Sequence, residues 1–121
     1  MGDYKDLIVF KKAYKLAMDI FEASKKFPAE EKYSLTDQIR RSSRSVCTNL
    51  VEAYRRRKYR PYFISKLTDS ETENAETQVW PDFSKDCQYL QIVQYNDFTF
   101  RNDEVGKMIW SMIQNPDKFT L

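Results

Sequence analysis

Apolar side chains recur at helical spacing along the first quarter of the chain, on two neighbouring stripes. One stripe holds Leu7, Phe10, Tyr14, Ala17, Phe21 and Ser24, and the other holds Val9, Ala13, Leu16, Ile20, Ala23 and Phe27. Alternating steps of three and four residues place such side chains on one face of an α-helix, so the pattern predicts a helix over about residues 4–26. One stripe is enough for a core, and we expect the second to contact another copy of the chain. The interface candidates are Val9, Ala13, Leu16 and Ile20.

A second helix is predicted over about residues 34–58. Phe27 precedes Pro28, and a residue before proline avoids the α region, so the first helix ends there. Ser34 stands where a hydroxyl can cap the next helix, with Asp37 at the capping-box position three residues later. Apolar or small side chains then follow at helical spacing: Leu35, Ile39, Ser42, Val46, Leu50 and Ala53.

The third and fourth helices are predicted over about residues 60–88 and 96–114. Pro61 falls in the first turn of the third helix, where proline is tolerated. Pro81 interrupts the same helix, yet Phe83 and Cys87 continue its pattern, so we expect a kink near Pro81. Four helices with short connections pack most simply up-down-up-down. The chain is therefore predicted to be all-α, a single antiparallel four-helix bundle over residues 1–121.

Composition agrees with this fold and limits where the protein acts. Only two glycines and four prolines are present, few for a protein built from strands and tight turns. No stretch approaches the roughly 20 apolar residues of a membrane span, and the first residues lack a signal-peptide pattern. We expect a cytoplasmic protein without membrane contact. Cys47 and Cys87 have no metal-like spacing and are predicted to be free thiols.

The sequence contains no recognisable set of catalytic residues. Histidine is absent, which removes the commonest general base and the commonest transition-metal ligand. Asp69, Glu73 and Glu76 share a helical face, but di-iron bundles need Glu-x-x-His pairs, which do not occur. No glycine-rich phosphate loop is present either. We therefore predict a protein that is not an enzyme and has no catalytic residues, metal or cofactor.

Charge is strongly polarised in the middle of the chain, although the net charge is only +2. Residues 33–66 hold nine Lys/Arg against two acids, and residues 67–91 hold six acids against Lys85. The basic residues form two groups: Arg40, Arg41 and Arg44, and then Arg55, Arg56, Arg57, Lys58 and Arg60. Such groups neutralise phosphates, and neighbouring tyrosines stack on unpaired bases, so both are nucleic-acid-binding candidates. Alternatively, the arginines pair with acids of the third helix.

Several motifs resemble one bacterial family along nearly the whole chain. They are YKDLIVFKKAYKLA, FPAEEKYSLTDQIRRSSRSVCTNLVEAYRR, FISKLTDSETENAETQVW, DEVGKMI and NPDKF. The chain is similar to the 23S rRNA-intervening-sequence proteins, and the resemblance implies a four-helix bundle that forms a homopentamer without known catalytic residues. A related branch comprises the accessory proteins of diversity-generating retroelements, which associate with a reverse transcriptase and nucleic acid. Positions that match the family's polar signature are Gln38, Ile39, Arg40, Arg41, Asn49 and Glu52.

Two hypotheses follow for the function. The first is a non-enzymatic, homopentameric accessory protein that binds RNA or single-stranded DNA. The second is a protein–protein adaptor ring, which binds a partner such as a reverse transcriptase without touching nucleic acid. Cys47 replaces a frequent proline of the family, while Ala53 and Arg55 replace frequent glycines, which favours a straighter second helix with a rigid basic end.

Overall fold

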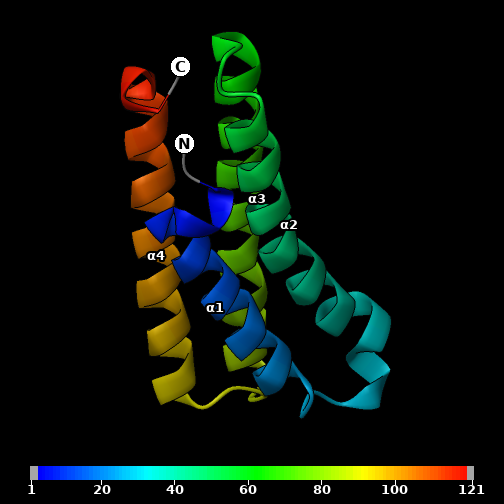
Figure 1. Cartoon of the computed structure of the whole chain (residues 1–121). Helices are drawn as coiled ribbons and strands as arrows, with labels where there is room; N and C mark the ends of the chain where they lie inside the picture. Colours follow the sequence, from blue (N-terminus) through cyan, green and yellow to red (C-terminus); the bar gives the residue numbers. More distant parts are fainter. Residues whose placement is uncertain (1–2, 120–121) are drawn as a thin grey trace.

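Four long helices make up most of the structure, a computed structural model that describes residues 3–119. They are α1 (Ile8–Ser24), α2 (Asp37–Arg55), α3 (Arg60–Asp86) and α4 (Ile92–Gln114). Each helix packs against the next along the chain, and α1 also contacts α4. Figure 1 shows neighbours in the chain running in opposite directions, with α1 and α3 descending and α2 and α4 ascending. The predicted all-α four-helix bundle is confirmed.

The first two helices are shorter than their predicted spans because other helical turns flank them. A 3₁₀ turn at Tyr4–Asp6, capped by the Asp3 side chain, precedes α1. A second 3₁₀ turn at Ala29–Glu31 and a π-helical turn at Lys32–Thr36 lead into α2. Ser34 lies inside the π-helical turn, where its Oγ donates to Glu31 Oε1 at 2.6 Å. The prediction that Ser34 caps the second helix is therefore wrong.

The last two helices differ from prediction mainly where α4 begins. Pro61 occupies the first turn of α3, as predicted, and the helix continues past Pro81 to Asp86. The kink at Pro81 stays a prediction. Gln91 caps α4, and its backbone N–H donates in return to Gln94 Oε1 at 3.2 Å. Because this reciprocal cap starts α4 at Ile92, the predicted start at residue 96 is four residues late.

The core consists of two apolar clusters with polar side chains between them along the helices. One cluster contains Val9, Ala13, Val46, Cys47, Leu50, Ala53, Phe63, Leu67, Val105, Ile109 and Met112. The other contains Leu16, Ile20, Phe27, Leu35, Ile39, Leu90 and Phe98. Between them, Thr77 Oγ1 donates to Ser42 Oγ at 3.0 Å. Asn74 and Asn102 each donate an amide N–H to the other's backbone carbonyl, at 3.1 and 2.9 Å. These bonds tie α3 to both α2 and α4.

The structure corrects the predicted oligomer interface. Val9, Ala13, Leu16 and Ile20 belong to the two core clusters and are between 1% and 4% exposed. They face the subunit's own interior, so no surface of theirs is available to a second copy. The large apolar side chains that α1 does expose are Ile8, Tyr14 and Met18. Within residues 3–119, no helix is long and apolar enough to cross a membrane.

Candidate nucleic-acid interface

Some basic residues already have acidic partners on the side of α2 that faces α3. Arg41 lies 3.6 Å from Glu73 and 3.0 Å from Glu76, measured from its Nη atoms to carboxylate oxygens. Lys66 Nζ lies 2.9 Å from Glu52, and this hydrogen bond raises the pKa of Lys66. The salt-bridge alternative is therefore correct for Arg41. Acids of α3 therefore neutralise Arg41, and Glu52 of α2 neutralises Lys66.

Two members of the basic group at residues 55–60 also have contacts within the subunit. Arg57 is only 8% exposed, its Nη1 donates to the Tyr54 backbone carbonyl at 2.8 Å, and its guanidinium lies 3.9 Å from the Tyr54 ring centre. Arg57 therefore holds the turn between α2 and α3 together and is removed from the phosphate-binding candidates. Arg60 forms an ion pair with Asp117, near the end of the chain. Neither cation is free to meet a ligand without losing its contacts.

Five candidates remain without a carboxylate partner in residues 3–119, namely Arg40, Arg44, Arg55, Arg56 and Lys58. Three of them share one face of α2, because steps of four and eleven residues return to the same side of a helix. We call Arg40, Arg44 and Arg55 the basic stripe; Arg44 and Arg55 are about 16 Å apart along the axis at 1.5 Å per residue. Arg56 and Lys58, both exposed in the turn after α2, form the basic turn.

Aromatic rings lie next to both basic groups. Arg40 and Arg44 stand 4.7 and 5.4 Å from the centre of the Phe21 ring, and Arg40 Nε also donates to Ser24 Oγ at 2.7 Å. Arg56 stands 5.3 Å from the Tyr62 ring. These cation–π contacts hold the guanidinium groups in place but leave their charge without a counterion.

An apolar groove of about 300 Å³ runs between α1 and α2 beside the basic stripe. We call it the aromatic groove; its walls are Tyr4, Phe10, Tyr14, Ala17, Met18, Arg44, Cys47, Thr48 and Val51. The Tyr4 and Phe10 rings meet edge to face at 5.1 Å, and Phe10 lies 5.9 Å from Tyr14. Burial raises the pKa of Cys47 to about 11, which keeps its thiol protonated and a poor nucleophile.

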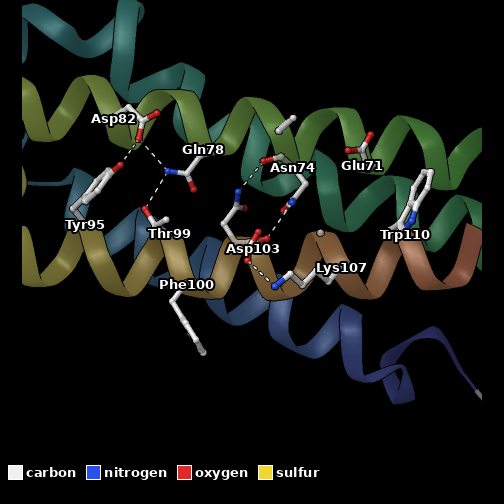
Figure 2. Close-up of a pocket in the computed structure, with 13 residues that line it drawn as sticks. Glu71, Asn74, Gln78, Asp82, Tyr95, Thr99, Phe100, Asp103, Lys107 and Trp110 are labelled. Carbon is white, nitrogen blue, oxygen red and sulfur yellow. Dashed lines mark hydrogen bonds and ion pairs between the residues drawn. The ribbon is translucent and has the colours of Figure 1, made fainter.

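The groove between α3 and α4, shown in Figure 2, is larger, at about 700 Å³, but several of its polar groups already bond to one another. Asp82 accepts hydrogen bonds from the Tyr95 hydroxyl at 2.6 Å and from Gln78 Nε2 at 3.0 Å. Asp103 pairs with Lys107 at 3.2 Å. No group of three or more Cys, Asp or Glu side chains suited to a metal ion occurs in residues 3–119. This groove therefore has fewer unpaired charged groups for a charged ligand than the basic stripe has.

The sequence analysis singled out the cations of this candidate interface but not the groove beside them. Phe10, Tyr14 and Ala17 were assigned to the core stripe of the first helix, although they line a groove that opens to solvent. Thr48 and Val51 were not singled out. The sequence does contain a pattern that could have identified Thr48 and Val51. Arg44, Thr48, Val51 and Arg55 are spaced by four, three and four residues, which places them on one face of a helix.

Comparison with known proteins gives a family match and similar solved structures. The family model described as 23S rRNA-intervening sequence protein matches residues 5–111. A crystal structure of a protein of unknown function from the S23 ribosomal protein family of Bacteroides thetaiotaomicron is similar, with a TM-score of 0.81 and 29% identity. The similarity covers 88% of this chain and 96% of that one. No curated protein matches the sequence.

Proposed function

The chain belongs to the 23S rRNA-intervening sequence protein family, and from that premise we propose that it is a non-enzymatic accessory protein that binds nucleic acid. Binding takes place at the basic stripe and the basic turn, which meet at the C-terminal end of α2. The ligand is RNA or single-stranded DNA. No residue of this interface carries out chemistry on it.

One observation carries the proposal: the positive charge on this side of the molecule is left without an internal counterion. Arg41 pairs with two acids of α3, Lys66 pairs with Glu52 of α2 and with Asp69, and Arg60 pairs with Asp117. By contrast, all five cations of the stripe and turn have no carboxylate partner in residues 3–119. An external polyanion would neutralise these charges. Its binding is favoured because the counterions condensed on the polyanion are released. Phosphate groups are well matched to arginine because the guanidinium donates two parallel hydrogen bonds.

Self-association remains part of the proposal, on different residues from those first assigned. The exposed face of α4 carries Val93 and Phe100, two turns apart and more than 70% exposed. Its charges neutralise each other, since Asp97 pairs with Arg101 at 3.0 Å and Asp103 with Lys107. A neutral face with large apolar side chains suits a second copy better than a phosphate. Five copies is the number that the family resemblance implies, and repetition would multiply weak phosphate sites.

The test is a salt titration of binding to a fluorescent single-stranded RNA, followed by anisotropy. The triple variant Arg55→Ala, Arg56→Ala, Lys58→Ala removes three candidate contacts. Each lost phosphate contact should reduce the steepness of the plot of log affinity against log salt by about 0.7, the value for single strands, and affinity should fall for every RNA sequence. Arg41→Ala is the control: it removes one arginine from α2 at a site that is already paired, and should change binding little.

Two results would refute the proposal. Unchanged binding in the triple variant would show that the C-terminal end of α2, where the stripe and the turn meet, is not the interface. If the wild type bound neither RNA nor single-stranded DNA at low salt, nucleic acid would be ruled out as the ligand. In that case the adaptor ring, with a protein partner such as a reverse transcriptase, becomes the better explanation of the charged surface.

A further inference from the structure

We propose that the aromatic groove holds an unpaired base of a single strand whose phosphates lie on the basic stripe. This inference rests on the proposed function and names the class of nucleic acid that the interface selects: single-stranded rather than double-stranded. It assigns a role to Tyr14, Phe10 and Met18, which the phosphate contacts alone leave unexplained.

The groove has the chemistry that a base requires. Its walls are mostly apolar and contain three aromatic rings, of which Tyr14 is the most accessible at 54% exposed. Any of the bases can stack its flat face on such a ring, so the contact does not depend on the nucleotide sequence. Met18 adds a flexible, polarisable wall that adapts to different ring shapes. A volume of about 300 Å³ lies at the lower end of the range for small-ligand sites.

The cations stand at both ends of this groove. Arg44 is the first α2 residue of the wall, while Arg55 lies one helical turn beyond Val51, the last α2 residue of the wall. A strand laid along α2 would therefore place phosphates on Arg44 and Arg55 and turn the base between them toward Tyr14. In a duplex the bases are stacked on each other and present only their edges in the grooves. The groove consequently favours an unstacked base, and with it a single strand.

A second copy of the chain fits the groove less well, because Arg44 would need a carboxylate from it. Five acids of α3 and α4 already have ion-pair partners within the subunit: Asp69, Glu73, Glu76, Asp97 and Asp103. Taking one of these five for Arg44 would break an existing ion pair. A phosphate brings its own negative charge and leaves those pairs intact.

The experiment compares three probes of equal length with the wild-type protein at low salt: a single-stranded oligonucleotide, the same strand made abasic, and a duplex. The abasic strand keeps the phosphates but has nothing to stack. We expect the base-bearing strand to bind roughly 5- to 150-fold more tightly than the abasic strand, the range for stacking one base on an aromatic side chain. The duplex should not gain this factor.

Tyr14→Ala tests the groove itself. The side chain is half exposed, so its loss should leave the fold intact, which circular dichroism checks. The affinity ratio of base-bearing to abasic strand should fall close to one, while Tyr14→Phe should keep the wild-type ratio. Tyr33→Ala, which removes an exposed tyrosine from the turn before α2, is the matched control and should also keep it.

The outcomes separate the two proposals. If the wild type binds abasic and base-bearing strands equally, or if Tyr14→Ala leaves the ratio unchanged, the base site is overturned while phosphate binding stands. If no probe binds at low salt, the proposed function fails and the base site fails with it. If Tyr14→Ala lowers the mass measured by light scattering and leaves the ratio unchanged, the groove is an interface between copies, which also overturns the inference.

Discussion

Replacing Gly106 with alanine tests how tightly α3 and α4 are held together. A Cβ atom at residue 106 would lie 2.7 Å from Asn74 Nδ2, closer than a carbon and a nitrogen can approach. Asn74 has little room to withdraw, since it is only 7% exposed and its Nδ2 donates to the Asn102 carbonyl at 3.1 Å. We therefore expect the substitution to displace the Asn74 amide and break this hydrogen bond.

Two opposing effects decide the sign of the change. Alanine is better than glycine inside a helix by about 1 kcal/mol. Loss of the hydrogen bond leaves a buried donor unsatisfied, which costs about 1–3 kcal/mol, and the crowded contact adds to that. The balance predicts that Gly106→Ala lowers the free energy of unfolding by about 1–2 kcal/mol, whereas helix propensity alone predicts an increase.

Urea denaturation, followed by circular dichroism, measures the effect in a double-mutant cycle. Asn74→Ala removes the amide that the new methyl group would strike. In that background Gly106→Ala should raise the free energy of unfolding by up to about 1 kcal/mol, because only helix propensity remains. The reasoning would be refuted if Gly106→Ala stabilised the protein equally with and without the Asn74 side chain.

Three further predictions concern the core, the thiols and a surface ion-pair network. Leu67→Ala should cost about 2–5 kcal/mol in urea denaturation, because Leu67 is fully buried. Cys87 is exposed and should react with a thiol reagent in the folded protein, whereas Cys47, buried with a pKa of about 11, should react only after unfolding. Burial raises the pKa of Asp19, but hydrogen bonds from Lys15 and Arg101 outweigh it and hold the pKa below 3.8, so this carboxylate stabilises the fold above that pH. Arg101→Gln should cost up to about 1 kcal/mol near neutral pH, and the deficit should shrink in acid as Asp19 is protonated; an equal deficit at both pH values would contradict this.

Helical periodicity predicted which segments are helices but could not say which face of the first helix is inside. Val9 and Phe10 begin two apolar stripes of similar strength, and both look suitable for a core. Packing against α2 and α4 buries the stripe of Val9 and leaves Tyr14, on the other stripe, half exposed. Which face is buried depends on the placement of the neighbouring helices, and one helix's own pattern does not contain that information.

In the candidate site, too, the sequence could not show which individual side chains face solvent. Arg55, Arg56 and Arg57 are consecutive and chemically identical, so the sequence assigned all three to phosphate binding. Successive residues of a helix point about 100° apart, and the turn after α2 directs only Arg57 back onto Tyr54. The pairing of Arg60 with Asp117 joins positions 57 residues apart and could be found only from the fold.

Stability alone does not account for the way α2 distributes its charge. Arg40 and Arg44 are four residues apart, a spacing at which like charges destabilise a helix by about 0.2–0.5 kcal/mol, and the Phe21 ring offsets this without neutralising either charge. Arg41, between them in sequence, is neutralised by two glutamates of α3, so this bundle pairs its arginines where carboxylates are in reach. The basic stripe thus keeps a repulsion that a bound anion would relieve, and binding that relieves repulsion in the free protein is strengthened by that amount. The same arrangement that slightly weakens the isolated subunit is therefore one that favours a polyanion along α2.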